Sequence, residues 1–305
     1  MLLILFCVFL NSCSLMKSPY PLNDFGSIDE GVFTYQGGYN KNKMIGPDFK
    51  IVDLPKCNNV RLTLPAYDVE EGKLLIGGSD GMKNKALNYP IVLNEDLEIV
   101  HSCKELAFLD WADFYDADKN IVIAYSPYKV FLVDMEKCEI IKNLVDFELD
   151  APFAGASWSY ERNLLAYGIK KYYPLENRSG YEVHILNPAN HSFSMVIEGA
   201  YPAWSKSGEL IAVLQEQALV ILDTEWNVVR KVDLSRYQSY LSDLSHIDWD
   251  GSENNVLISI ISAQNQDDNK FTIYHYDIEK DVIELVLTDA TDARWIPAGF
   301  CGVEK

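Results

Sequence analysis

The chain alternates short apolar runs with polar turns along almost its whole length. β-Branched and aromatic residues fill the runs, for example 139–144, 210–214 and 228–232, and Gly, Asn and Asp separate them. Short runs of this composition predict β-strands, whereas the spacing of an amphipathic helix is nearly absent. The pattern therefore predicts an all-β protein.

One segment of the chain recurs: an aromatic residue, a polar turn and an apolar strand. The fullest copy spans 201–214, close copies span 155–167 and 246–258, and weaker copies span 66–76 and 113–123, with a half-copy at 293–297. Six aromatic anchors follow at intervals of 43 to 48 residues: Tyr67, Tyr115, Trp158, Trp204, Trp249 and Trp295. A period of this length predicts a β-propeller.

Each repeat supplies four strands, which is enough for one blade. The anchor strand is followed by a second strand, by a third that ends in Asp or Asn, and by a fourth. The third strands end at Asn94, Asp134, Asn187, Asp223 and Asp277. A four-stranded blade buries both faces only when it stacks on its neighbours, and a bulky aromatic at one position of each blade fills the space between the sheets.

The last anchor, Trp295, lies ten residues before the end of the chain, so its blade needs strands from elsewhere. The segments 32–36, 49–54 and 60–64 are candidates, and we expect one C-terminal and three N-terminal strands in this blade. A strand at 300–303 would change the division to two and two. Either arrangement closes the ring, removes a free sheet edge and makes 31–305 a single domain.

The pattern Trp-Ser-x-x-Gly-x-Leu-Ile-Ala around Trp204, with a partner strand ending in Leu222-Asp223, resembles the repeat of TolB-like, WD-repeat-like β-propellers. The resemblance implies a six-bladed propeller of four-stranded antiparallel blades. In that family the turn usually reads Ser-Pro-Asp-Gly. Here residues 205–208 read Ser-Lys-Ser-Gly and 159–162 read Ser-Tyr-Glu-Arg, so the match is to the repeat class. Propellers include binding modules and enzymes, and the resemblance implies a fold rather than a function.

The N-terminus has the pattern of an exported lipoprotein. Residues 2–10 form an unbroken apolar run, which fits the apolar core of a signal peptide and is half the length of a membrane-spanning helix. The following Leu10-Asn11-Ser12-Cys13 resembles the bacterial lipobox, although no Lys or Arg precedes the run. The resemblance implies a signal peptide at 1–12, lipidation of Cys13, and a tether at 13–30. We expect a lipid anchor in the bacterial cell envelope, at the outer membrane facing the periplasm or exterior.

The net charge and the cysteines bear on the partners, disulfides and cofactors to be expected. Lys and Arg number 26 against 45 Asp and Glu, and a net charge of −19 disfavours nucleic acid as a partner. Four cysteines lie after Cys13: Cys57, Cys103, Cys138 and Cys301. An exported compartment permits disulfides, but the sequence leaves three pairings and free thiols open. There is no CxxC motif and no histidine pair at metal spacing, so we expect neither a metal nor another cofactor.

Polar residues on the predicted innermost strands are candidates for the channel or its rim. They are Asp110, Trp111, Asp113, His246, Asp248, Asp292 and Arg294. His246, near Asp248, is a weak catalytic candidate. The alternative is that these side chains form hydrogen bonds between blades. Two further motifs favour turns: Gly77–Gly81 matches G-x-S-x-G without a following helix, and Asp116–Asn120 lacks the glycine and glutamate of a calcium loop.

Two long inter-strand segments, 170–180 and 235–245, are candidate contact loops. The first is the most basic and tyrosine-rich piece of this acidic chain. Their candidate contact residues are Lys170, Lys171, Tyr172, Tyr173, Arg178, Tyr237 and Tyr240.

The sequence therefore favours an envelope lipoprotein whose propeller is a non-catalytic binding module for another envelope protein. The alternative is a propeller enzyme, a hydrolase or lyase acting on carbohydrate or peptide, with His246 and nearby carboxylates as acid and base. A third possibility is a ring that organises envelope complexes without a ligand pocket.

Overall fold

The computed structural model describes most of the repeat region and part of the N-terminal region. The described residues are 30–36, 41–45, 51–53, 66–68, 72–79, 88–94, 98–106, 109–126, 128–146, 153–173, 177–237, 245–261, 271–288 and 290–297. The predictions for Cys13, Cys57, Tyr240 and Cys301, for the signal peptide and for residues 13–29 of the tether lie outside them. Glu30, predicted as the last tether residue, begins the first strand. The described residues include no helix that is long and apolar enough to cross a membrane.

Five sheets are each built from four strands that are consecutive in the chain. Blade 1 contains β4 (Ala66–Asp68), β5 (Lys73–Ser79), β6 (Asn88–Leu93) and β7 (Ile99–Ser102), followed by the short 3-10 helix η3 (Lys104–Leu106). Blade 2 contains β8 (Asp110–Asp116), β9 (Ile121–Ser126), β10 (Lys129–Asp134) and β11 (Glu139–Asp146). Blade 3 contains β12 (Phe153–Ser159), β13 (Leu164–Tyr173), β14 (Arg178–Asn187) and β15 (Ser192–Glu198). Blade 4 contains β16 (Ala200–Trp204), β17 (Leu210–Gln215), β18 (Ala218–Asp223) and β19 (Val228–Asp233). Blade 5 contains β20 (His246–Trp249), β21 (Asn255–Ile261), β22 (Phe271–Asp277) and β23 (Val282–Thr288).

A further four-stranded sheet combines the two ends of the chain. Its order is β24 (Ala290–Pro297), β1 (Glu30–Gln36), β2 (Lys41–Ile45) and β3 (Ile51–Asp53). Strand β24 pairs antiparallel with β1, with Val32 opposite Trp295, so the predicted pairing of N- and C-terminal strands is confirmed. We call this the composite sheet.

The count of six blades needs a correction. Five blades are continuous in the chain, and a sixth is reached only by counting the composite sheet. The strand prediction was also incomplete: the polar segment 41–45 forms β2, and the predicted strand at 60–64 lies outside the described residues. Because β2 is rich in Lys and Asn, it lacks the apolar composition by which a strand is found in sequence.

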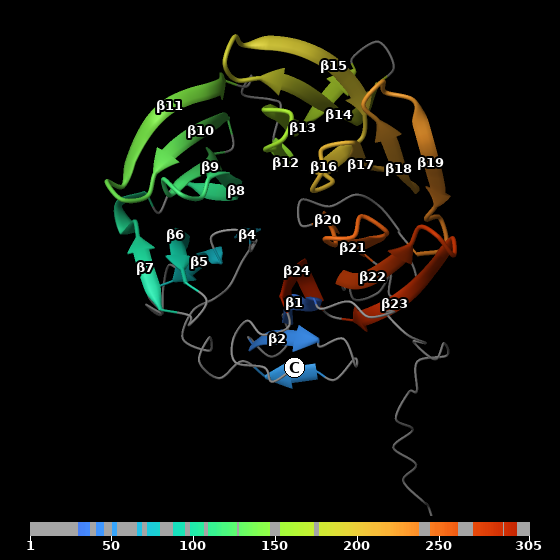
Figure 1. Cartoon of the computed structure of the whole chain (residues 1–305). Helices are drawn as coiled ribbons and strands as arrows, with labels where there is room; N and C mark the ends of the chain where they lie inside the picture. Colours follow the sequence, from blue (N-terminus) through green and yellow to red (C-terminus); the bar gives the residue numbers. More distant parts are fainter. Residues whose placement is uncertain are drawn as a thin grey trace, which may run out of the picture.

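The sheets stand in a ring, with the first strand of each continuous blade innermost and the fourth outermost (Figure 1). Every pairing within the sheets is antiparallel. The prediction of an all-β propeller of four-stranded antiparallel blades is therefore confirmed.

The Asp and Asn residues at the ends of the third strands shape the turns that follow. The Oδ1 atom of Asp134 accepts the backbone N–H groups of Glu136 and Lys137, each at 3.0 Å. Asp223 accepts those of Glu225 and Asn227 in the same way, each at 2.9 Å. A short side-chain acceptor at this position replaces the ladder partners that the turning backbone has lost. The recurrence of Asp or Asn thus has a local cause.

The fourth strand of each continuous blade contains or faces a β-bulge. The pairing between third and fourth strands shifts register once or twice in each blade. Its shifts include Val92/Leu93, Leu132/Val133, Ile185/Leu186, Ile221/Leu222 and Ile273/Tyr274. The outermost strand is therefore twisted away from a flat edge at an equivalent point of each of these blades.

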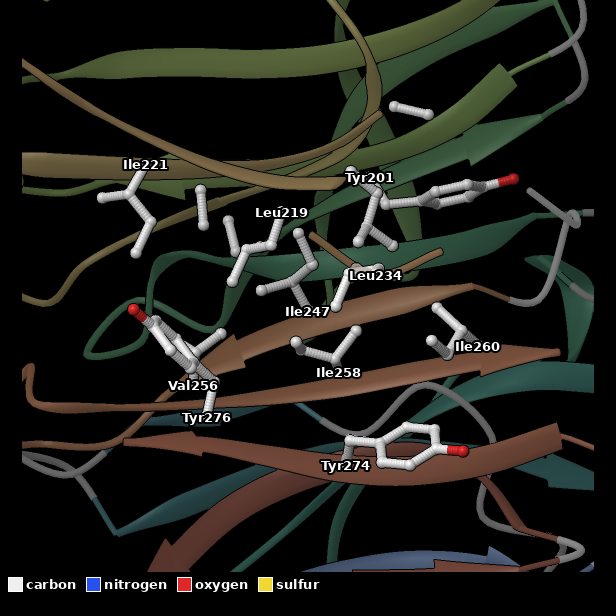
Figure 2. Packing of buried hydrophobic residues seen from close by; sticks show 14 of the residues in the cluster. Tyr201, Leu219, Ile221, Leu234, Ile247, Val256, Ile258, Ile260, Tyr274 and Tyr276 are labelled. Carbon is white, nitrogen blue, oxygen red and sulfur yellow. The ribbon is translucent and has the colours of Figure 1, made fainter. Parts of the chain in front are cut away.

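The main core lies between adjacent blades. Its largest cluster joins β17 and β18 of blade 4 to β21 and β22 of blade 5, with Leu219, Ile258 and Tyr276 fully buried (Figure 2). Hydrogen bonds cross the same kind of interface. The N–H of Trp204 donates to Ser157 Oγ at 3.0 Å, and the N–H of Trp295 donates to Asp248 Oδ2 at 2.7 Å. Each of these bonds spans 47 residues, so the sequence period reappears as the spacing between bonded residues of neighbouring blades.

A disulfide joins blades 1 and 2. Cys103, just after β7, bonds to Cys138 in the β10–β11 turn, with their Cα atoms 5.2 Å apart. The structure thereby selects one of the pairings that the sequence left open.

Candidate binding surface

Strands β13 and β14 extend beyond the rest of blade 3. Each has ten residues, but β12 pairs with β13 only as far as Ile169, and β15 pairs with β14 only from Glu182. The remaining four pairs run from Lys170 opposite Tyr181 to Tyr173 opposite Arg178. Residues 170–173 and 178–181 thus form a two-stranded projection, which we call the projecting hairpin. The predicted loop at 170–180 is therefore largely paired strand.

One face of the projecting hairpin is fixed by the carboxylate of Glu182. The hydroxyl of Tyr173 donates to Glu182 Oε1 at 2.6 Å, and Lys171 Nζ lies 3.3 Å from both oxygens. His184 Nε2 lies 3.2 Å from Oε2. Burial raises the pKa of Glu182, but these hydrogen bonds outweigh it and hold the pKa below its usual value. The carboxylate is therefore ionised and anchors the base of the hairpin.

The other face is held by tyrosine rings. Lys170 Nζ lies 5.8 Å from the centre of the Tyr181 ring, and that ring is 6.4 Å from the ring of Tyr201 in blade 4. The hydroxyl of Tyr172 donates to Asn177 Oδ1 at 2.8 Å, while 51% of Tyr172 remains exposed. The hairpin is thus anchored at its base and presents an aromatic side chain to solvent.

The second candidate segment, 235–245, is described at its two ends only. Tyr237 is half-buried, and its ring meets that of Tyr274 edge-on at 5.1 Å. This segment leads from the outermost strand of blade 4 to the innermost strand of blade 5. In antiparallel blades such a connection leaves at the same end of the sheet as the turn between second and third strands. The described ends of this segment and the projecting hairpin therefore lie at one end of the ring.

Tyrosines gather at this end of blades 3 to 5. In Figure 2 the hydroxyls of Tyr201 and Tyr274 lie at one end of the cluster, and that of Tyr276 lies at the other. We call Tyr172, Tyr181, Tyr201, Tyr237 and Tyr274 the tyrosine face. The opposite end of the ring carries the turns between first and second strands, including the exposed Tyr160 in blade 3.

The candidate channel residues lie on innermost strands, as expected. His246 and Asp248 are on β20, and both are half-buried. Asp248 accepts the N–H of Trp295 across a blade interface, as the structural alternative predicts. Asp113 accepts the N–H of its neighbour Phe114 at 2.9 Å. The backbones of the remaining candidates belong to β8 and β24, and their side chains lie outside the described set: Asp110, Trp111, Asp292 and Arg294. A ligand site at these positions, and a catalytic role for His246, stay predictions.

A buried polar chain in blade 5 was not predicted. His275 lies on β22 and is only 3% exposed. Its Nε2 donates to Asn255 Oδ1 at 2.7 Å, and Asn255 Nδ2 donates to Asp250 Oδ2 at 2.8 Å. Burial lowers the pKa of His275 to about 4, so the ring is neutral at pH 7. The one sequence signal is its position inside the apolar strand 271–277, where a polar residue is expected to need a partner.

The described side chains include no cluster of three or more His, Cys, Asp or Glu residues suited to a metal ion. Their smaller groups of charged residues are ion pairs and turn-capping carboxylates, for example Asp134 with Lys137.

Comparison with known proteins supports the fold alone. No family model matches the chain, and no curated protein matches it. Among solved structures, a Bacteroides caccae protein of unknown function matches with a TM-score of 0.57 and 14% identity, over 88% of this chain and 98% of that one. A chain in a nidogen/laminin complex matches with a TM-score of 0.60 and 7% identity, over 87% of this chain and 98% of that one. At these identities the likeness extends to the fold and no further.

Proposed function

We propose that this chain is a lipid-anchored protein of the bacterial cell envelope whose propeller is a non-catalytic module for binding another protein. The projecting hairpin carries the proposal. It extends past its blade, its base is fixed by Glu182 and Tyr181, and it presents Tyr172, a residue type enriched at binding hot spots. The propeller supports such a role because a ring with buried interfaces is a rigid platform.

The proposal also covers the number of blades. We take the composite sheet as a sixth blade, so that the ring is six-bladed and TolB-like, in line with the resemblance around Trp204. One of the similar folds comes from a complex between proteins, nidogen and laminin, which is consistent with a propeller that binds protein.

Two features support the location. The lipobox-like sequence at 10–13 places a cysteine where lipidation would anchor the chain. The disulfide between Cys103 and Cys138 is of a kind that persists in oxidising compartments such as the periplasm and cell surface.

The binding role is tested by cross-linking the full-length protein in its native envelope and rebuilding the captured complex from purified components. We expect one protein partner, bound about five-fold or more weakly by Tyr172→Ala, because truncating an anchor residue typically costs above 1 kcal/mol. The matched control is Tyr160→Ala, which removes an exposed tyrosine from the other end of blade 3. Equal weakening by both variants, or no partner, contradicts the proposal.

The anchor is tested separately. Cells fed a labelled fatty acid should label the wild-type chain and leave Cys13→Ser unlabelled and released from the membrane fraction. An unlabelled wild-type chain would remove the lipoprotein part and leave the binding module intact.

A further inference from the structure

We infer that the partner presents an acidic polypeptide segment to the projecting hairpin; this rests on the proposed function and names the chemistry of its partner. The first argument is charge. The whole chain carries −19, yet the eight residues of the projecting hairpin include Lys170, Lys171 and Arg178 and no acidic residue. Within the sequence 170–181 the only carboxylate is Glu176. By sequence, the hairpin strands therefore carry net positive charge in a chain that is strongly negative overall.

The second argument is how the hairpin holds its ammonium groups. Elsewhere on the ring, Lys119, Lys137 and Lys280 each pair with an aspartate at 2.6 to 2.9 Å, and Lys129 does so with Asp146 at 2.9 Å. Lys170 lies over the ring of Tyr181 instead, and among the described residues no carboxylate pairs with it. A ring face attracts an ammonium group without neutralising its charge. Lys170 therefore keeps a full positive charge for an incoming carboxylate.

Lys171 is partly paired and partly exposed to solvent. It contacts Glu182 at 3.3 Å and lies 5.8 Å from the centre of the Tyr173 ring, but half of its side chain remains exposed. Tyr172 follows the two lysines in sequence and shares a face of the hairpin with Lys170, whereas Lys171 lies on the opposite face beside Glu182. One face therefore offers a cation next to an exposed aromatic ring, and the other face offers a second, partly paired cation. An acidic segment docked on the first face gains from Lys170 and Tyr172 directly and from Lys171 through its longer-range charge, and the negative field of the remaining surface repels it from other docking positions. Charge thereby selects both the partner and the face.

The experiment places a photo-cross-linker where the contact is expected. The full-length chain is made in its native envelope with p-benzoylphenylalanine at position 172, and in a matched sample at position 160, and mass spectrometry identifies the adduct. We expect position 172 to capture a protein segment rich in Asp and Glu, and position 160 to capture none. Lys170→Glu should lower the yield about ten-fold, as expected when a steering charge is reversed, and added salt should lower it too.

Two controls protect the interpretation. Lys206→Glu makes the same charge change at an exposed turn of blade 4, at the other end of the ring, and should leave the yield unchanged. Lys170→Gln removes the charge without adding one and should give an intermediate yield if the protein remains folded.

The failing outcomes are distinct. A neutral or basic segment captured at position 172 overturns the inference while the proposed function stands. A protein captured only at position 160 overturns the inference and moves the binding face. A polysaccharide adduct, or no adduct at either position, overturns the inference and contradicts the protein-binding function as well.

Discussion

Trp204 and Trp249 occupy the same position in successive blades, and they are 7% and 8% exposed, yet their indole N–H groups differ. The Nε1 atom of Trp249 donates to the carbonyl of Ala203 in blade 4 at 2.9 Å. The Nε1 atom of Trp204 is buried and has no hydrogen-bond partner among the described residues; its ring packs edge-on against Trp226 at 6.2 Å. The repeat therefore preserves the bulk of the aromatic, while its polar group is satisfied in one blade and not in the next.

The largest expected loss of stability comes from removing the aromatic bulk that Trp204 and Trp249 share. Trp204→Ala and Trp249→Ala should each lower the free energy of unfolding by about 3–5 kcal/mol, because each leaves a large cavity between blades. Chemical denaturation measures both. A loss well below this range for either residue would show that its blade interface collapses into the space.

A covalent link between blades provides the next contrast. Cys103→Ser with Cys138→Ser should lower the free energy of unfolding by about 3–4 kcal/mol, since the disulfide closes a loop between residues 35 positions apart. Reduction of the wild-type protein should reproduce the loss and leave the double variant unaffected. If the double variant matches the oxidised wild type in denaturation, the link between blades 1 and 2 adds no stability.

Acid should destabilise blade 5 through His275. The folded state holds the pKa of His275 near 4, below its usual 6.5, so its stabilising effect is complete above pH 6.5 and is lost as the pH falls toward 4. The loss should reach about 3 kcal/mol, reduced by Glu284, whose pKa burial raises and which acts in the opposite sense.

Denaturation at a series of pH values measures this loss, with His275→Gln as the control. The variant should show little pH dependence between 6.5 and 4. A wild-type protein with constant stability across that window contradicts the buried neutral histidine.

The smallest effect separates the two tryptophans directly. Trp249→Phe should cost about 1–2 kcal/mol more than Trp204→Phe, because it leaves the Ala203 carbonyl without its donor, whereas Trp204→Phe removes a donor that already lacks an acceptor. The two variants lose the same atoms, so each controls for the other in one denaturation series. Equal losses would mean that the hydrogen bond to Ala203 contributes nothing measurable.

The sequence predicted the features that repeat and missed those that occur once. The anchors Trp158, Trp204 and Trp249 could be found because bulk and spacing recur, and the pairing of β24 with β1 followed from a half-copy left over at the C-terminus. The bond between Cys103 and Cys138 could not, because it depends on how two neighbouring blades stack. At 170–180, Pro174 and polar residues concealed two strands that pair with each other beyond the blade. The buried chain from His275 through Asn255 to Asp250 could not be predicted either, because Asn255 lies on another strand.

The bulges in the fourth strands have a consequence for solubility. The outermost strands expose apolar side chains, including Ile141, Phe193 and Val228, beside backbone groups that have no further strand to pair with among the described residues. A flat edge of that composition is a template for cross-β aggregation between molecules. The bulges interrupt the hydrogen-bond ladder between third and fourth strands at least once in each continuous blade. An approaching strand therefore cannot form a continuous series of hydrogen bonds with the outermost strand. The outermost strands can therefore carry apolar side chains without promoting fibril growth.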